Sequence, residues 1–408
     1  MPDNAKPTDP TGGTVIVGTG LAGYAVAREL RKLDAGRPVT VVTRDDGDFY
    51  AKPSLSNALA QGKTADALVT TPGPVIARQL GITLRTRTAV DAIDTVSRTL
   101  RTTQGPLRYD RLVLATGADP IRLPLSGDAV KAVRQVNDLG DYRILRSGLA
   151  AGTRVVILGA GLIGSEFAND LRAAGIEVDV VDLAPRPLAA LLPEQAGRWF
   201  ASRLAGAGVR WHFGEKAQAV NARAGRLELT LDSGAKLQAD LVLSAVGLRP
   251  RIGVAADAGL SVERGIRVDR FGATSDPDVF ALGDCAQYEG RLMPYVQPIM
   301  VASRAIAATL AGTETPIAFG PMPVVVKTPA CPVTVLPPSP DAAGRWESDA
   351  QPDALTMRFI DAQDRLQGFA LLGAATARRR QLLELLGHRS GTDTGAARTP
   401  TEQPIQAQ

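Results

Sequence analysis

Cysteine and histidine are scarce in this chain of 408 residues, which contains two of each. The cysteines, Cys285 and Cys331, form no C-x-x-C pair and no Cys/His cluster with the spacing of metal ligands. A histidine-ligated metal and a histidine-based catalytic triad are therefore nearly excluded. We expect no metal site, and we expect both cysteines to be small buried residues that form no redox pair.

Long apolar runs and a strong net charge are also lacking. No uncharged apolar stretch is long enough to cross a bilayer, and the N-terminal segment lacks the layout of a secretory signal. We therefore expect a cytoplasmic protein without membrane insertion. The formal net charge is +4, and no block of Lys and Arg is interleaved with aromatic residues, which argues against nucleic-acid binding. This mild positive charge would help to steer a small acidic protein partner.

Glycine-rich turns, in contrast, occur twice in the same setting. The run TVIVGTGLAGYAVAREL begins at Thr14, and RVVILGAGLIGSEFANDL begins at Arg154. In each run, β-branched residues precede a G-x-G-x-x-G turn, and a segment with a helical apolar period follows it. The first run predicts a strand over 14–17 and a helix over 21–33, and the second predicts the same order of elements. Each run therefore predicts a β-α-β unit that opens a parallel sheet.

A second pair of similar segments supports a duplication. RLVLATGADP ends with Gly117 and Pro120, and DLVLSAVGLRP ends with Gly247 and Pro250. One unit therefore begins where the other is interrupted. A Pro-rich region follows, with the alternating segments LTMRFID and LQGFALLG, which predict a strand pair. The predicted fold class is α/β, with two nested Rossmann-like dinucleotide-binding domains and a small α+β C-terminal domain.

The expected domain boundaries follow from these repeats and from composition. The third domain is expected to end in a helix over 374–386. Both ends of the chain are polar and poor in apolar residues, which is typical of disorder. We expect a first domain of 1–122 and 251–320, a second of 123–250, a third of 321–389, and disorder over 1–13 and 390–408.

A glycine turn between a strand and a helix is suited to a dinucleotide. Glycine lets the backbone approach a diphosphate, and the helix N-terminus supplies unpaired N–H groups and a partial positive charge. Two such turns in one chain indicate one resident and one exchanging dinucleotide. We expect resident FAD at the turn of the first domain and a nicotinamide dinucleotide at the turn of the second.

The two units differ at the ends of their second strands. Asp182 follows Gly159 at roughly the 20-residue spacing from which an acid binds the ribose hydroxyls. Its charge would repel the 2′-phosphate of NADPH, so we expect NADH, although the nearby Arg186 offers the alternative of binding that phosphate. The equivalent position in the first unit is Thr43, so the usual acid is missing there.

The segment DVFALGDCAQ, together with the first glycine turn and the Ala115–Gly117 segment, resembles the two-dinucleotide flavoproteins that include glutathione reductase and ferredoxin reductases. The resemblance implies that Asp284 binds a ribityl hydroxyl of FAD, and the alternative is a turn aspartate that ends a strand. Relatives with a redox dithiol carry C-x-x-x-x-C where this chain has YAKPSLSNAL, from Tyr50 onward. Without a thiol relay, electrons are expected to leave the flavin directly for another redox protein.

Within that family the chain closely resembles the bacterial rubredoxin–NAD reductases. It has KPSLSN where ferredoxin reductases of oxygenase systems usually show R-P-P-L-S-K, and it lacks their Trp-containing stretch. The segments that carry the resemblance are YAKPSLSNAL, GAGLIGSEFANDL, MPYVQPIM, VVVKTPACPVTVLPP and GFALLGA. It implies an FAD-dependent reductase that takes a hydride from NADH and passes single electrons to rubredoxin, an acidic carrier that would feed an alkane hydroxylase or an oxygen-detoxifying system.

The resemblance also implies roles for individual side chains. Lys52 and Lys327 are expected near the isoalloxazine, where a cation stabilises the reduced flavin, and the alternative is that both are surface lysines. Glu166 is expected to bind the nicotinamide carboxamide, or else to complement the helix dipole as a first-turn glutamate. Lys52, Glu166 and Lys327 are thus the expected catalytic residues. The expected cofactor-binding residues are Gly18, Gly20, Leu21, Ala22, Gly23, Arg44, Lys52, Pro53, Val90, Ala115, Thr116, Gly117, Gly159, Gly161, Leu162, Ile163, Gly164, Glu166, Asp182, Arg186, Val246, Gly247, Gly283, Asp284, Val296 and Lys327.

Other functions remain open at this point. One is a ferredoxin reductase of a cytochrome P450 or dioxygenase system, and another is a flavorubredoxin reductase. A third, of a different class, is a flavin-bound signalling protein that senses NADH without passing electrons to a carrier. The sequence is equally compatible with a monomer and a homodimer.

Overall fold

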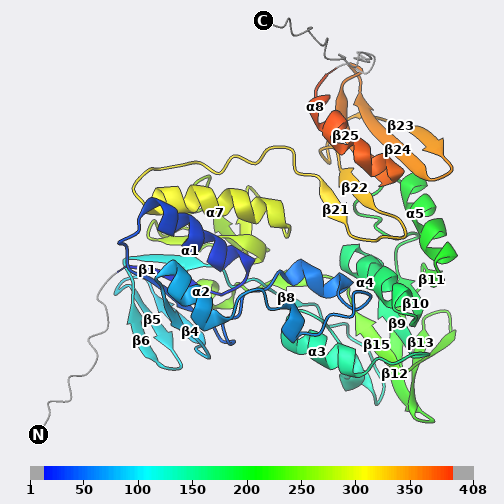
Figure 1. Cartoon of the computed structure of the whole chain (residues 1–408), viewed down its shortest axis with the longest axis horizontal. Helices are drawn as coiled ribbons and strands as arrows, with labels where there is room; N and C mark the ends of the chain where they lie inside the picture. The colour runs from blue at the N-terminus through cyan, green and yellow to red at the C-terminus, as the bar shows by residue number, and fades with distance from the viewer. Residues whose placement is uncertain (1–12, 389–408) are drawn as a thin grey trace, which may run out of the picture.

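The computed structural model describes residues 13–388 and contains three sheet-based parts (Figure 1). The residues before Gly13 and the predicted disordered tail from residue 390 lie outside the described residues. Gly13 itself is held in place, because its N–H donates to Asp110 Oδ2 at 2.7 Å. None of the helices in the described part of the chain has the length and apolar character that a membrane crossing requires.

The first part is built on a parallel five-stranded sheet with the order β18-β7-β1-β2-β3. Helices α1 (Leu21–Leu33) and α7 (Val296–Leu310) lie side by side against it (Figure 1). The predicted strand 14–17 and helix 21–33 are confirmed to the residue. The strands are β1 (Thr14–Val17), β2 (Val39–Val42), β3 (Thr83–Arg85), β7 (Arg111–Leu114) and β18 (Val279–Ala281).

Smaller elements complete this part. They include an antiparallel sheet of β4, β5 and β6 and a second small sheet of β17, β19 and β20. The 3-10 helix η1 (Lys52–Asn57) carries the KPSLSN segment. The remaining bounds are β4 (Val90–Asp94), β5 (Thr99–Thr102), β6 (Gly105–Arg108), β17 (Ile266–Val268), β19 (Ala286–Tyr288), β20 (Arg291–Leu292), α2 (Gly73–Leu80), α6 (Gly253–Asp257), η2 (Asp66–Leu68) and η4 (Gly283–Cys285).

The second part repeats the design with a parallel sheet of order β11-β10-β9-β15. Helix α4 (Leu162–Ala173) follows β9 directly, as the second glycine-rich run predicts. An antiparallel sheet of β12, β13 and β14 packs on one face of it, against side chains of β9, β10 and β15. The other bounds are β9 (Arg154–Leu158), β10 (Glu177–Asp182), β11 (Val209–Phe213), β12 (Ala217–Arg223), β13 (Arg226–Leu231), β14 (Lys236–Ala239), β15 (Leu241–Ser244), η3 (Val130–Ala132), α3 (Leu139–Ser147) and α5 (Glu194–Gly206).

The two duplicated segments meet where the chain passes between these parts. Strand β8 (Ala118–Pro120) is the last part of one of them, and β16 (Leu248–Pro250) is the last part of the other. The two strands pair antiparallel, with Leu248 opposite Pro120 and Pro250 opposite Ala118. The nested connection that the repeats predict therefore takes the form of a short two-stranded ribbon.

The third part is an antiparallel five-stranded sheet of order β21-β22-β25-β24-β23. The predicted strand pair is confirmed as β24 (Ala354–Asp361) and β25 (Leu366–Gly373). A polar edge strand, β23 (Gly344–Gln351), has no counterpart in the sequence prediction. The remaining strands are β21 (Val324–Val326) and β22 (Val333–Leu336).

The predicted C-terminal helix over 374–386 is wrong in its extent. Its first turns are the 3-10 helix η5 (Ala374–Arg378), and the α-helix α8 spans only Arg379–Glu384. Tertiary contacts explain the early end, because Leu386 forms a bridge with Leu366 and the Gly387 N–H donates to the Leu366 carbonyl. The last residues thus extend the sheet instead of the helix.

The second and third parts share one hydrophobic core. Helix α5 contacts β11 on one side and both β24 and β25 on the other. Buried residues of β9, β10 and α5 lie in the same cluster as Val333, Leu355 and Leu372 of the third part. The first part is built around a separate cluster. The third part is therefore joined to the second part by packing, whereas residues 311–323, which lead to it from the first, form no regular element.

This shared core predicts the effect of a cavity in α5. Phe200 is fully buried there, and Phe200→Ala should lower the free energy of unfolding by about 3–5 kcal/mol through lost apolar burial and an unfilled cavity. The three tryptophans of the sequence, Trp199, Trp211 and Trp346, all pack against this core. Denaturant unfolding followed by tryptophan fluorescence therefore measures the effect.

The control for this measurement is Val96→Ala in the first part. Val96 is 96% exposed, so the fluorescence midpoint should not change. Separate transitions for the tryptophans of the second part and for Trp346 would contradict a shared core.

Candidate functional site

The first glycine turn leaves the N-terminus of α1 open. A Cβ at Gly18, where φ is +116°, would lie 2.3 Å from the Ala115 carbonyl oxygen, and one at Gly23 would lie 1.9 Å from the Gly18 oxygen. Only glycine fits these two positions. At Gly20, in contrast, an added Cβ meets nothing within 4 Å, and no side chain caps the helix. The free N–H groups of α1 thus face open space, which is what a bound diphosphate requires.

The other predicted FAD-binding segments gather around this turn. Ala115–Gly117 follow β7, the neighbour of β1, and Gly283 and Asp284 follow β18, the next strand, so both lie at the carboxyl end of the same sheet. A Cβ at Gly283 would lie 3.0 Å from the Ala22 side chain. The structure therefore brings together three segments that are far apart in the sequence, at the edge of the sheet where ligands of such folds bind.

Two opposite charges lie half-buried next to these segments. Burial lowers the pKa of Lys52, while the nearby Asp284 carboxylate acts to raise it. Burial raises the pKa of Asp284, and the charges of Lys52 and Arg251 oppose that shift. Each group therefore depends on the other to stay charged in a region poor in water.

The second glycine turn repeats the geometry of the first. A Cβ at Gly164 would lie 1.9 Å from the Gly159 oxygen, whereas one at Gly161 meets nothing within 4 Å. Gly159 in turn faces the backbone of Ala245 and Val246, which follow β15. The predicted residues of this turn thus form one group at the carboxyl end of the second sheet.

Asp182 holds the second turn in shape. Its carboxylate accepts hydrogen bonds from the Ala160 N–H at 2.5 Å and the Ala184 N–H at 2.7 Å. Arg186 is turned toward α5: its side chain lies against Gly197, and Nη2 donates to the Leu192 carbonyl at 3.3 Å. The structure therefore places Asp182 at the second glycine turn, whereas Arg186 is hydrogen-bonded to the Leu192 carbonyl.

Asp45 occupies the place of the acid that is missing at Thr43. Its Oδ1 accepts hydrogen bonds from Thr43 Oγ1 at 2.7 Å, from Thr19 Oγ1 at 3.0 Å and from the Gly47 N–H at 2.9 Å. The sequence prediction missed this role because Asp45 lies two residues beyond the expected position. A carboxylate next to the first glycine turn is therefore present after all, and it fastens the end of β2 to that turn.

Glu166 joins three parts of the chain. The residue is 0% exposed, and its Oε2 accepts from Ser56 Oγ of η1 at 2.5 Å. Its Oε1 accepts from the Lys327 N–H at 2.8 Å, and Lys327 Nζ lies 3.4 Å from Oε2. Lys327 Nζ also donates to the Pro53 carbonyl. Glu166 thus lies beyond the first turn of α4 and acts as a buried acceptor, so it is no ordinary first-turn glutamate.

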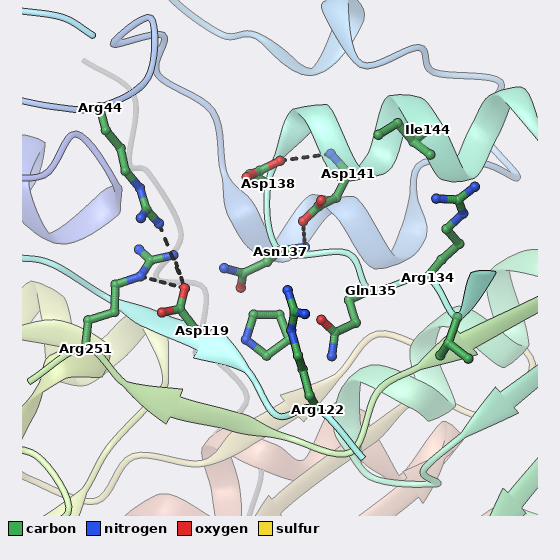
Figure 2. Close-up of a pocket in the computed structure, with 12 residues that line it drawn as sticks. Arg44, Asp119, Arg122, Arg134, Gln135, Asn137, Asp138, Asp141, Ile144 and Arg251 are labelled. Carbon is green, nitrogen blue, oxygen red and sulfur yellow. Dashed lines mark hydrogen bonds and ion pairs between the residues drawn. The ribbon is translucent and has the colours of Figure 1, made fainter. Parts of the chain in front are cut away.

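A cavity of about 330 Å³ opens between the first two parts, beside the β8–β16 ribbon. Figure 2 shows the guanidinium groups of Arg44 and Arg122 pointing into it. Arg251 Nε donates to Asp119 at 2.7 Å on one wall. On the opposite side Asn137 donates to the Ala118 carbonyl, while its buried Oδ1 has no partner. The lining carries four arginines against three aspartates, and the unpaired amide oxygen can accept a hydrogen bond, so the cavity suits a polar ligand.

The other predicted residues lie at the ends of helices and strands in the first two parts. Leu21 and Ala22 begin α1, Leu162 and Ile163 begin α4, and Gly247 follows β15. Val296, 41% exposed, begins α7, and Val90 begins β4. The sequence prediction missed a second set of polar residues, some of which are buried next to the predicted ones. These are Asp45, Ser56, Asp119, Arg122, Asn137, Asn169, Asp170 and Arg251.

Both cysteines are buried and unpaired. Burial raises the pKa of the Cys331 thiol to about 12 and also raises that of Cys285. Thiols with raised pKa values are poor nucleophiles. The expected burial of both cysteines is confirmed, and the described residues contain no cluster of metal-ligand side chains.

The two kinds of glycine position in α4 allow binding to be separated from folding. Gly161→Ala should leave the thermal unfolding midpoint unchanged, because its φ is −70° and the methyl group meets no atom. The same methyl group would occupy the space before the helix N–H groups, so NADH should bind about tenfold or more weakly. Gly164→Ala should instead lower the midpoint. Fluorescence titration with NADH and a thermal melt test both expectations, and unchanged NADH affinity in Gly161→Ala would refute the assignment of this turn.

Comparisons with known protein families match nearly all of the described chain. The model of the pyridine nucleotide-disulphide oxidoreductase family matches residues 13–308, and a model described as the rubredoxin binding C-terminal domain matches residues 316–386. The gap between the two, residues 309–315, includes the end of α7 and the start of the segment without regular structure that leads into the third part.

Three known proteins illustrate the relationship. The rubredoxin-NAD(+) reductase of Alcanivorax borkumensis is 45% identical, over 90% of this chain and 97% of its own. The nitric oxide reductase FlRd-NAD(+) reductase of Aeromonas hydrophila is 39% identical, over 88% of this chain and 92% of its own. Among solved structures, the ferredoxin reductase for the CYP199A2 system from Rhodopseudomonas palustris has a TM-score of 0.82 at 30% identity, over 90% of this chain and 93% of its own.

These matches confirm the resemblance found in the sequence. The first model covers more than half of the chain, and both curated relatives align over nearly their full length. The chain belongs to the pyridine nucleotide-disulphide oxidoreductase family, within its group of rubredoxin-NAD(+) reductases.

Proposed function

We propose that this protein is an FAD-dependent reductase that takes a hydride from NADH and passes single electrons to rubredoxin. One observation carries the proposal: Lys327, from the domain that matches a rubredoxin-binding model, binds Glu166 of α4 and the Pro53 carbonyl of η1. The helix that follows the second glycine turn, the segment that carries Lys52 and the carrier domain therefore meet at Glu166. A protein carrier bound to that domain would lie close to both nucleotides.

The residues around the first turn suit FAD. Gly18 and Gly23 allow close approach, the open N-terminus of α1 faces the diphosphate, and Asp284 is the acceptor for a ribityl hydroxyl. When bound, FAD supplies the chemistry that converts the two electrons of a hydride into single-electron transfers. The chain contributes position and charge, with Lys52 and Lys327 as the nearby cations.

The absence of a dithiol supports a protein acceptor. Both cysteines are buried and unpaired, and neither is part of the η1 segment where dithiol relatives carry the redox pair. Free thiols also suit a cytoplasmic location. The chain therefore has no thiol relay of its own, and electrons must pass to an external carrier.

The carrier is identified by direct competition between candidates. We expect NADH to reduce the bound flavin rapidly in a stopped-flow instrument, and rubredoxin to reoxidise it faster than a 2Fe–2S ferredoxin does. Cytochrome c reduction with each carrier in turn gives the steady-state comparison. A preference for ferredoxin would favour a ferredoxin reductase activity, like that of the solved structure that is 30% identical to this chain. A preference for a flavorubredoxin would favour the activity for which the Aeromonas relative is named. Slow flavin reduction by NADH would favour a signalling role and contradict an electron-transfer enzyme.

The choice between NADH and NADPH should depend on Asp182. Asp182→Ser removes the charge that repels a 2′-phosphate, so the preference for NADH should narrow by about tenfold, the effect of roughly 1.4 kcal/mol. The ratio of kcat/KM values for NADH and NADPH measures it.

The control for this variant is Asp179→Asn. Asp179 is a buried acid on the same strand, and its partners are Arg210 and His212. The control should leave the ratio unchanged. The assignment of Asp182 would be wrong if the ratio did not change in Asp182→Ser.

A further inference from the structure

Three polar residues lie on the buried face of α4. Glu166, Asn169 and Asp170 are spaced i, i+3 and i+4, so they project from one side of the helix. Their exposed fractions are 0%, 6% and 3%. Burial of such groups is costly unless hydrogen bonds replace the lost water. All three find their partners in other parts of the chain.

Asp170 binds the segment that follows η1. Its Oδ2 accepts from the Leu59 N–H at 2.8 Å, and its Oδ1 accepts from the Ala60 N–H at 3.1 Å. Burial raises the pKa of this carboxyl, and the two N–H groups oppose that shift. Both oxygens are thus used to fix the end of the segment that begins with Lys52.

Asn169 binds the turn that follows β21. Its Oδ1 accepts from the Ala330 N–H at 3.1 Å. The same turn is closed by the Cys331 N–H, which donates to the Thr328 carbonyl at 2.8 Å. Lys327 lies at the start of this turn. Asn169 therefore holds the third part in the same way as Asp170 holds η1.

These contacts fix the distance between two lysines that no direct bond connects. Lys52 begins η1, and Lys327 follows β21. Both segments rest on α4, whose N-terminus forms the second glycine turn. The chain that links the first part to β21 has no regular structure over residues 311–323, so it cannot set this distance (Figure 1). The buried face of α4 does so instead.

We propose that Asp170 is a positioning residue for electron transfer, with Asn169 as its counterpart on the carrier side. Asp170 holds η1 against α4, so that Lys52 and the Pro53 carbonyl bonded to Lys327 keep their places beside the flavin site. The inference rests on the proposed function, because it concerns the step that delivers electrons to the carrier. It goes beyond that function because it assigns the placement of Lys52 and Lys327 to Asp170, a residue that contacts neither glycine turn.

The test replaces Asp170 without changing its size. Asp170→Asn puts an amide group opposite two N–H donors, so at least one hydrogen bond is lost. In the purified holoprotein we expect hydrogen exchange at the Leu59 and Ala60 amides to accelerate about tenfold or more, as loss of a bond to a charged group implies. Carrier reduction should slow by about tenfold, while the KM for NADH changes by less than about twofold. The visible absorption spectrum of the bound flavin should shift, because Lys52 moves.

A matched control separates positioning from general loss of stability. Asp179→Asn changes another buried aspartate in the second part, which is 8% exposed and does not contact η1. It should lower the thermal midpoint without altering the flavin spectrum or exchange at Leu59. Asn169→Leu, of similar size, should slow carrier reduction and speed exchange at Ala330 but not at Leu59.

The outcomes distinguish this inference from the proposed function. Faster exchange at Leu59 and Ala60 with an unchanged flavin spectrum and unchanged electron transfer would overturn the positioning role. Equal effects of Asp170→Asn and Asp179→Asn would overturn it too. If rubredoxin proves to be the wrong carrier, the exchange and spectral effects still test the role of Asp170, and electron transfer is then measured with the carrier that the protein accepts.

Discussion

A carboxylate that is wholly removed from water destabilises a fold unless donors surround it, and Glu166 meets that condition with donors from two other parts of the chain. Ser56 comes from η1 and Lys327 from the start of the third part. Loss of either donor would leave one oxygen of this buried carboxylate without its hydrogen bond. The relative placement of η1, α4 and β21 therefore depends on this group together with Asn169 and Asp170, and the two lysines on these segments share that constraint.

A second pair of charged groups, Lys52 and Asp284, also stabilise each other near the first glycine turn. Lys52 and Asp284 are each driven toward the neutral form by burial and each stabilised as an ion by the other. The adjacent cavity places four arginines, among them Arg251 bonded to Asp119, against three aspartates. Its lining is therefore polar and only slightly positive, which suits a polar ligand between the two parts.

Sequence patterns correctly predicted those elements whose bounds are set by residues close together in the sequence. The bounds of β1 and α1 follow from a run of β-branched residues, a glycine turn and an apolar period, all within 20 residues of sequence, and they are correct. The prediction failed where distant contacts decide. The C-terminal helix ends early because Leu386 pairs with Leu366, and the polar strand β23 exists because β24 offers it an edge. Asn169 and Asp170 were missed although a signal was present: polar residues at i, i+3 and i+4 on the buried face of an otherwise apolar helix require partners that only the fold can reveal.

The shared core gives this arrangement a mechanical consequence. Because the second and third parts pack around one hydrophobic cluster, the domain matched by a rubredoxin-binding model behaves as an extension of the domain with the second glycine turn. The first part meets them at the β8–β16 ribbon and at η1, where Asp170 and Glu166 hold the segment. Any rotation between the first part and the other two must therefore break buried hydrogen bonds at η1. Dithiol-containing members of the family carry their redox pair at η1, whereas the two cysteines of this chain are buried and unpaired. Without a thiol relay, electron transfer depends on the distance from the flavin site to the carrier, which the fold must control. The polar face of α4 is the element that controls it.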